Sequence, residues 1–131
     1  MTPEKLILRA FQALEHAHAP YSGYAVGAAL QCEDGTVFTG CNVENASYGL
    51  TNCAERSAVF SAISGGHKSF TAIAIASSAA PPPFPCGACR QVLAEFCSPG
   101  FKVYIADGDG FQTVTLGELL PHAFDLGDSN A

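Results

Sequence analysis

Charged residues and tryptophan are scarce in this chain. Of its 131 residues none is tryptophan, one is methionine and only 14% are charged, with six Lys plus Arg against twelve Asp plus Glu. The formal net charge of -6 leaves no basic surface of the kind that a phosphate backbone requires, which argues against a nucleic-acid partner. Apolar residues make up 48%, and a surface this poor in charge favours oligomers over a solitary monomer.

Long apolar runs are also missing. No stretch approaches the ~20 residues of a membrane-spanning helix, which argues against a membrane partner. The amino terminus carries Glu4, Lys5 and Arg9 where a secretory signal would be apolar. Six cysteines are present, but a disulfide between Cys86 and Cys89 would join residues too close in sequence to stabilise the fold. A core of this size also does not depend on disulfides for its stability. We therefore expect a reduced, soluble, cytoplasmic protein.

The order of expected elements predicts the fold class. Helices are expected from Thr2 to Leu14, from Cys53 to about Ser64 and over 87–96, with a short one over 116–120. Strands are expected over 24–30, 36–41, 71–76, 101–106 and 111–115. This order predicts one α/β domain over residues 1–131, a three-layer α/β/α arrangement with a mixed five-stranded sheet. Residues from about 125 to 131 are expected to be a loose C-terminal tail.

Three cysteines and a glutamate form the most informative pattern. Cys53 and Glu55 open one expected helix, while Cys86 and Cys89 open another, so all should lie at one edge of the sheet. Cysteines three residues apart face the same way in a first helical turn, where free N–H groups favour thiolates. Three sulfur ligands leave the fourth position of a tetrahedral Zn²⁺ open, as in catalytic zinc sites. The pattern predicts zinc on Cys53, Cys86 and Cys89, with Glu55 as the catalytic proton carrier.

Other interpretations of these cysteines stay open at this point. A bare C-x-x-C also occurs in redox pairs, and a structural four-cysteine site could recruit Cys41 or Cys97. A non-enzymatic zinc- or redox-binding module is therefore the competing hypothesis. The position of Glu55, two residues after Cys53, favours a catalytic site.

A resemblance to a known family is carried by four segments, Tyr21–Ala29, Asn42–Tyr48, Cys53–Arg56 and Pro85–Leu93. With these segments, most of the chain, from about residue 21 to 124, resembles the cytidine deaminases of the small, homotetrameric, zinc-dependent type. The zinc motif is shared by the wider deaminase superfamily, whereas Asn42–Tyr48 is more specific and points to nucleosides. The chain departs from the family at Tyr24, where other members often have Phe.

The resemblance implies a reaction and its participants. Cytidine and 2′-deoxycytidine would be hydrolysed to uridine and 2′-deoxyuridine with release of ammonia, a step in pyrimidine salvage. Active sites would be shared between the subunits of a homotetramer, with Phe124 reaching a neighbour's pocket. The residues implied to bind substrate are Tyr24, Asn42, Glu44, Ala46, Tyr48, Ala54 and Phe124.

Several of these residues also have plainer interpretations. Asn42 and Glu44 could organise a surface turn, and Tyr48 and Phe124 could be ordinary core aromatics. Arg56 lies three residues after Cys53, on the same side of the helix, and could donate a hydrogen bond to the ligand sulfur. Such a cation would offset the net charge of about −1 that three thiolates give a zinc ion. A deaminase for nucleotides, for RNA or DNA, or for a blasticidin-like antibiotic is a further alternative.

Overall fold

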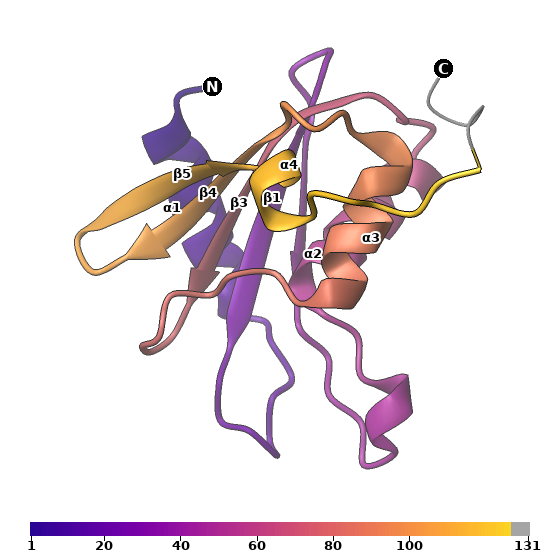
Figure 1. Cartoon of the computed structure of the whole chain (residues 1–131). Coiled ribbons are helices and arrows are strands. Elements are labelled where there is room, and N and C mark those ends of the chain that lie inside the picture. The colour runs from indigo at the N-terminus through magenta and orange to yellow at the C-terminus, as the bar shows by residue number, and fades with distance from the viewer. Residues whose placement is uncertain (127–131) are drawn as a thin grey trace.

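A single mixed sheet of five strands organises the computed structural model, which describes residues 1–126 (Figure 1). Its spatial order is β2-β1-β3-β4-β5. The strands are β1 (Val26–Cys32), β2 (Val37–Cys41), β3 (Phe70–Ser77), β4 (Lys102–Asp107) and β5 (Gly110–Thr115). Only β3 and β4 run parallel, because α3 crosses between them, and the other neighbours are antiparallel.

Helices cover both faces of this sheet. Helix α1 (Pro3–Leu14) packs on one face, mainly against β1 and β3, while α2 (Ala54–Ser64) and α3 (Gly87–Phe96) lie on the other (Figure 1). Two shorter pieces complete the chain, the 3-10 turn η1 (Tyr48–Leu50) and α4 (Leu116–Leu119). The predicted three-layer α/β/α architecture is confirmed. Among the described residues, no helix is long and apolar enough to cross a bilayer.

The alternating side chains of β3 give the two faces different packing. Ala72, Ala74 and Ala76 pack with the buried stripe of α1, whereas Ile73 and Ile75 pack with α2 and α3. Alternate residues of a strand point to opposite faces, so this run serves both layers at once. The small residues let α1 lie close to the sheet, and the bulkier core forms beneath the helices that carry the cysteines.

Gly40 fixes the approach of α2 to the sheet. A Cβ atom on Gly40 would lie 2.5 Å from the carbonyl oxygen of Ala54 and 2.5 Å from the amide nitrogen of Ala58. The first turn of α2 therefore lies directly on the backbone of β2. This contact sets the position of Cys53, the residue before the helix.

The element boundaries differ from the prediction at β1. The strand expected over 24–30 begins at Val26 and ends at Cys32. The backbone N–H groups of Tyr24 and Ala25 donate to the hydroxyls of Ser22 and Ser78, so neither joins the ladder. The expected helix over 87–96 is confirmed. Most of the predicted tail, residues 127–131, lies outside the described residues.

We expect Gly40→Ala to lower the free energy of unfolding by about 1–3 kcal/mol, because the added methyl overpacks backbone atoms that cannot move independently. Urea unfolding would measure the loss. Gly110→Ala is the matched control, since it adds the same methyl to β5 where no atom lies within 4 Å. An equal loss in both variants would contradict the close approach of α2 to β2.

Candidate active site

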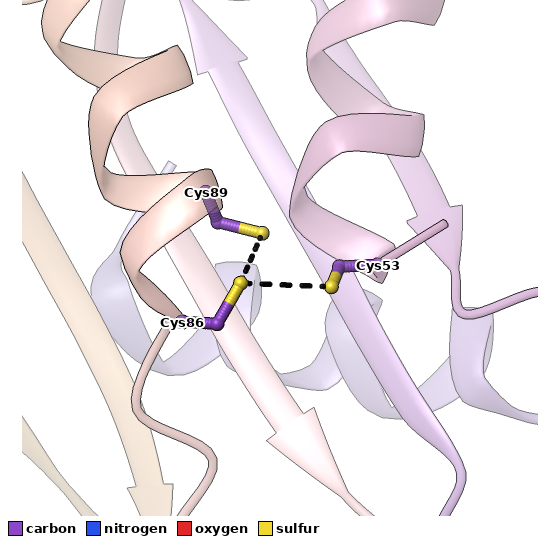
Figure 2. A group of neighbouring side chains, drawn as sticks. All are labelled: Cys53, Cys86 and Cys89. Atoms are coloured by element: carbon purple, nitrogen blue, oxygen red, sulfur yellow. Dashed lines mark hydrogen bonds between the residues drawn. The ribbon is translucent and has the colours of Figure 1, made fainter. Parts of the chain in front are cut away.

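Three cysteine thiols converge between the amino-terminal ends of α2 and α3 (Figure 2). Cys53 and Cys86 are the residues immediately before the two helices, and Cys89 lies in the first turn of α3. The sulfur atoms of Cys53 and Cys86 are 3.8 Å apart, and those of Cys86 and Cys89 are 3.4 Å apart. All three lie within 4.8 Å of one another, so a single ion can contact all of them.

The loop between β2 and α2 returns the chain to this point. Val43 and Asn52 exchange backbone hydrogen bonds of 2.9 and 3.0 Å, which close the base of the loop. The residues between them, including η1, project from the body of the molecule (Figure 1). Because Asn52 is paired in this way, Cys53 enters α2 beside the end of β2.

The donor set fits zinc. Zn–S bonds of about 2.3 Å in a tetrahedron separate neighbouring sulfurs by about 3.8 Å, close to the spacing found here. Among the described residues these three thiols are the one such group of metal-binding side chains, and two of them, Cys53 and Cys86, line the adjoining cavity. The predicted cluster of Cys53, Cys86 and Cys89 is therefore assembled, and it would supply three ligands to a zinc ion, the number that catalytic zinc sites use.

Hydrogen bonds and helix ends favour a thiolate at this site. The pKa of Cys53 is well below its usual range, chiefly because the Cys89 thiol hydrogen-bonds to it, with Arg56 adding a second donor. The pKa of Cys89 is raised by that same hydrogen bond and by burial. The free N–H groups at the start of both helices also favour negative charge. These contacts favour a negative charge on the Cys53 sulfur, as binding to a metal cation requires.

Glu55 is buried beside the thiols without belonging to their cluster. Its side chain is 5% exposed and lines a cavity of about 470 Å³ that also reaches Cys53 and Cys86. Burial raises the pKa of Glu55 to about 7. A carboxyl group with such a pKa exchanges protons readily near neutral pH, as a general acid or base must.

The cavity is lined by residues from distant parts of the sequence. Three of the residues expected to bind substrate, Tyr24, Asn42 and Ala54, line it together with Pro81–Phe84. The Tyr24 hydroxyl donates a 2.6 Å hydrogen bond to the carbonyl of Pro81, which ties Tyr24 to the proline segment. Pro81–Phe84 are not among the residues predicted to bind substrate. Their position shortly before the C-x-x-C was the available signal that they border the site.

The Asn42 side chain makes two hydrogen bonds to the backbone and keeps two hydrogen-bonding positions for another partner. Its side-chain oxygen accepts from the Val26 N–H at 2.9 Å, and its amide nitrogen donates to the Tyr24 carbonyl at 2.8 Å. An amide group has two donors and two acceptor positions, so one of each remains for another partner. Asn42 is 8% exposed and lines the cavity, where those positions can meet a ligand.

Glu44 lies in a neighbouring hollow and not in the cavity with Glu55. The hollow has a volume of about 380 Å³ and meets the cavity at Thr51, which lines both. The Glu44 carboxylate accepts from the backbone N–H groups of Tyr21 and Ser22, at 3.0 and 3.1 Å, and from the Ser22 hydroxyl. These hydrogen bonds, the Ser22 hydroxyl foremost, lower the pKa of Glu44. The carboxylate thus organises the turn at residues 21–22.

The remaining predicted substrate residues lie at the surface. Tyr48 is 78% exposed and Phe124 is 70% exposed, and Ala46 lies exposed in the same loop as Tyr48. The alternative interpretation of Tyr48 and Phe124 as core aromatics is wrong. Neither ring enters its own chain's cavity.

Comparison with known proteins agrees with this geometry. Residues 1–105 match the family model described as the cytidine and deoxycytidylate deaminase zinc-binding region. A cytidine deaminase of Sporosarcina psychrophila is 50% identical over 129 residues, covering 98% of this chain and 95% of the relative. The crystal structure of cytidine deaminase from Burkholderia pseudomallei superposes with a TM-score of 0.90 at 50% identity, covering 95% of this chain and all of that one. The corresponding Mycobacterium tuberculosis structure gives 0.84 at 42% identity, with 96% and 99% covered.

The chain belongs to the cytidine and deoxycytidylate deaminase family. The matched region is the zinc-binding one and contains all three cysteines of the cluster. Zinc is therefore the metal of this site, and the redox-pair and four-cysteine interpretations are set aside.

Arg56 contacts the sulfur cluster from α2. Its Nη2 donates to the Cys53 sulfur at 3.3 Å. Its Nε is buried and has no hydrogen-bond partner within the described part of the chain. The contact raises the pKa of the guanidinium, which keeps a positive charge beside the thiolates of this deaminase site.

We expect Arg56→Ala to weaken zinc binding about 10- to 100-fold, the usual effect of removing a group that supports a metal ligand. Competition with a chromogenic chelator would measure the affinity. Lys68→Ala is the control, because it removes an exposed cation from the loop before β3. Equal zinc affinity in the two variants would show that Arg56 does not support the site.

Proposed function

We propose that this chain catalyses the hydrolytic deamination of cytidine and 2′-deoxycytidine to uridine and 2′-deoxyuridine with release of ammonia. The observation that carries the proposal is a three-thiol zinc site with a buried carboxylate, Glu55, in the same cavity. The cavity volume of about 470 Å³ lies within the range of small-molecule sites. The cytidine deaminases with near-complete coverage support this substrate class.

Glu55 is the proposed proton carrier. Zinc, when bound, lowers the pKa of water and so supplies a nucleophile at neutral pH. Glu55 accepts a proton from the attacking water and delivers it to N3 of the pyrimidine ring. It then takes the proton of the hydroxyl that the water has added to the ring carbon and passes it to the amine, so that the carbon–nitrogen bond breaks, a carbonyl forms and ammonia leaves. Glu55 thus acts first as a base and then as an acid. Its burial keeps bulk water from competing for these protons.

The walls of the cavity are proposed to hold the nucleoside. The Tyr24 ring and the backbone at Ala54 line the space for the pyrimidine. Asn42 retains one donor and one acceptor position for a ribose hydroxyl. Glu44 lies next to this space, across Thr51. Its carboxylate accepts hydrogen bonds from Tyr21 and Ser22, and a carboxylate has about four acceptor positions, so it can also accept from a ribose hydroxyl.

The competing functions make different demands on the chain. A nucleotide or nucleic-acid substrate calls for basic side chains, and only six Lys and Arg are present. A blasticidin-like antibiotic has no ribose for Asn42 and Glu44 to bind. A non-enzymatic module would bind zinc without releasing ammonia. We further propose a role in pyrimidine salvage in the cytoplasm, where the three ligand thiols stay reduced.

The substrate assignment predicts a clear order of activities. We expect ammonia release from cytidine and deoxycytidine with at least tenfold lower kcat/KM on cytidine 5′-monophosphate, because no cation among the cavity-lining residues is available for the phosphate. Loss of absorbance would follow each reaction, with cytosine and adenosine as further comparisons. Equal kcat/KM on the nucleoside and its phosphate would overturn the assignment.

Glu55→Gln should retain zinc and the fold while kcat falls by about 10²–10⁴-fold, because an amide cannot shuttle protons. Glu95→Gln, at an exposed position of α3, makes the same chemical change away from the cavity and should leave kcat unaltered. A zinc-loaded Glu55→Gln enzyme with more than about a tenth of the original kcat would exclude Glu55 as the proton carrier.

We propose that the chain works as a homotetramer in which neighbouring subunits complete each site through Phe124, Ala46 and Tyr48. The two aromatic rings are exposed and lie outside their own cavity. Tyr21, Leu50 and Phe84 are exposed as well, so the region around the hollow and the cavity presents apolar surface. Surface of this kind marks interaction sites, and the low charge of the chain suits association.

Subunit mixing would test this sharing. Phe124→Ala should raise KM a few-fold to about tenfold, because it removes one ring-stacking contact with the substrate, and zinc should stay bound. Mixing inactive Glu55→Gln chains with impaired chains truncated before Phe124 should restore part of the activity once subunits exchange. Some hybrid sites then pair an intact Glu55 with a donated Phe124. No recovery despite demonstrated exchange would place Phe124 outside its neighbour's site.

A further inference from the structure

The Arg90 side chain joins two segments that are far apart in sequence. Its Nε donates to the carbonyl of Pro85 at 2.7 Å, and its Nη1 donates to the carbonyl of Leu119 at 2.8 Å. Pro85 directly precedes the zinc ligand Cys86, and Leu119 is the last residue of α4. One guanidinium therefore contacts both the loop that carries a zinc ligand and the last residue of α4. The C-terminal arm, which we define as residues 120–126, continues directly from that residue.

The C-terminal arm begins from a fixed point and is held again near its end. Leu116 is 3% exposed, and Thr115 and Glu118 form a capping box at the start of α4. Beyond α4 the arm passes across α3 (Figure 1), where the Gln91 side-chain nitrogen donates to the Phe124 carbonyl at 2.7 Å. Two consecutive side chains of α3 thus hold the backbone at both ends of the segment that leads to Phe124.

The chemistry of the contact requires an arginine. A guanidinium has donors in a rigid plane and stays charged, so it can satisfy two carbonyls in fixed directions with charge-assisted hydrogen bonds. A lysine has a point charge on a flexible stem and cannot reproduce both directions. The backbone N–H of Arg90 makes the first intrahelical hydrogen bond of α3, to the Cys86 carbonyl at 3.0 Å. Because its side chain bonds to the carbonyls of Pro85 and Leu119 at once, Arg90 links the position of the arm to that of the zinc-binding loop.

We propose that Arg90 is a positioning residue that sets the C-terminal arm, and with it Phe124, relative to the zinc-binding loop. It does not contact the reacting atoms but acts on substrate affinity through the arm. The effect on affinity rests on the proposed function, whereas the effect on the arm does not.

Arg90→Gln and Arg90→Lys test the proposal, with Arg9→Gln on α1 as the matched control. We expect Arg90→Gln to raise KM for cytidine about three- to tenfold, with kcat and zinc content within twofold of the original. The KM of the Arg90→Lys variant should lie between those of the original enzyme and the Arg90→Gln variant. Amide hydrogen exchange of residues 120–126 should speed up in both Arg90 variants and stay unchanged in the control. If the Gln variant does not fold, the Lys variant supplies the comparison.

A double variant distinguishes an effect of Arg90 on KM through the C-terminal arm from an effect through a general loss of structure. In a Phe124→Ala background, Arg90→Gln should change KM by less than twofold, because the two changes remove the same contact. Unchanged exchange in the arm, or a KM effect that persists without Phe124, would overturn the proposal. If the original chain released no ammonia from cytidine, the proposed function would fall, and hydrogen exchange would still decide whether Arg90 holds the arm.

Discussion

Three thiols brought to the first turns of two helices form the constraint on which the rest of this structure depends. Gly40 lets α2 lie on β2, and the crossover from β3 to β4 brings α3 alongside, so sulfurs from distant residues meet. Both helices direct free N–H groups toward the cluster, and Arg56 adds a cation. The helix ends and the Arg56 cation favour negative charge at the three sulfurs, which a metal ion with three thiolate ligands requires.

The cavity beside the cluster follows from the same arrangement. Cys53 and Glu55 are two residues apart, so the turn that presents a ligand also buries the carboxylate next to it. Pro81–Pro83 line the same cavity, and the Tyr24 hydroxyl donates a hydrogen bond to the Pro81 carbonyl. The three thiols, the proposed proton carrier and the proposed substrate cavity are thus parts of one connected structure, and Arg90 joins it to the C-terminal arm.

The sequence predicts the parts of this site that are encoded locally. The ligand spacing and the helix over 87–96 follow from residues close together in the chain, as does the α/β order of elements. The location of Glu44 could not be predicted in this way, because it depends on hydrogen bonds to Tyr21 and Ser22, more than twenty residues away. The start of β1 was misplaced for a similar reason, since side chains from Ser22 and Ser78 take the donors of residues 24–25.

X-ray absorption at the zinc edge of the purified protein would count the sulfur ligands of the bound ion. An open three-thiol site predicts one zinc per chain with three sulfur scatterers at about 2.3 Å and one lighter oxygen or nitrogen scatterer at about 2.0 Å. Each change to serine, at Cys53, Cys86 or Cys89, should remove one sulfur from the shell. A shell of four sulfurs would exclude an open site, because a closed site has no position for water or substrate and would be structural.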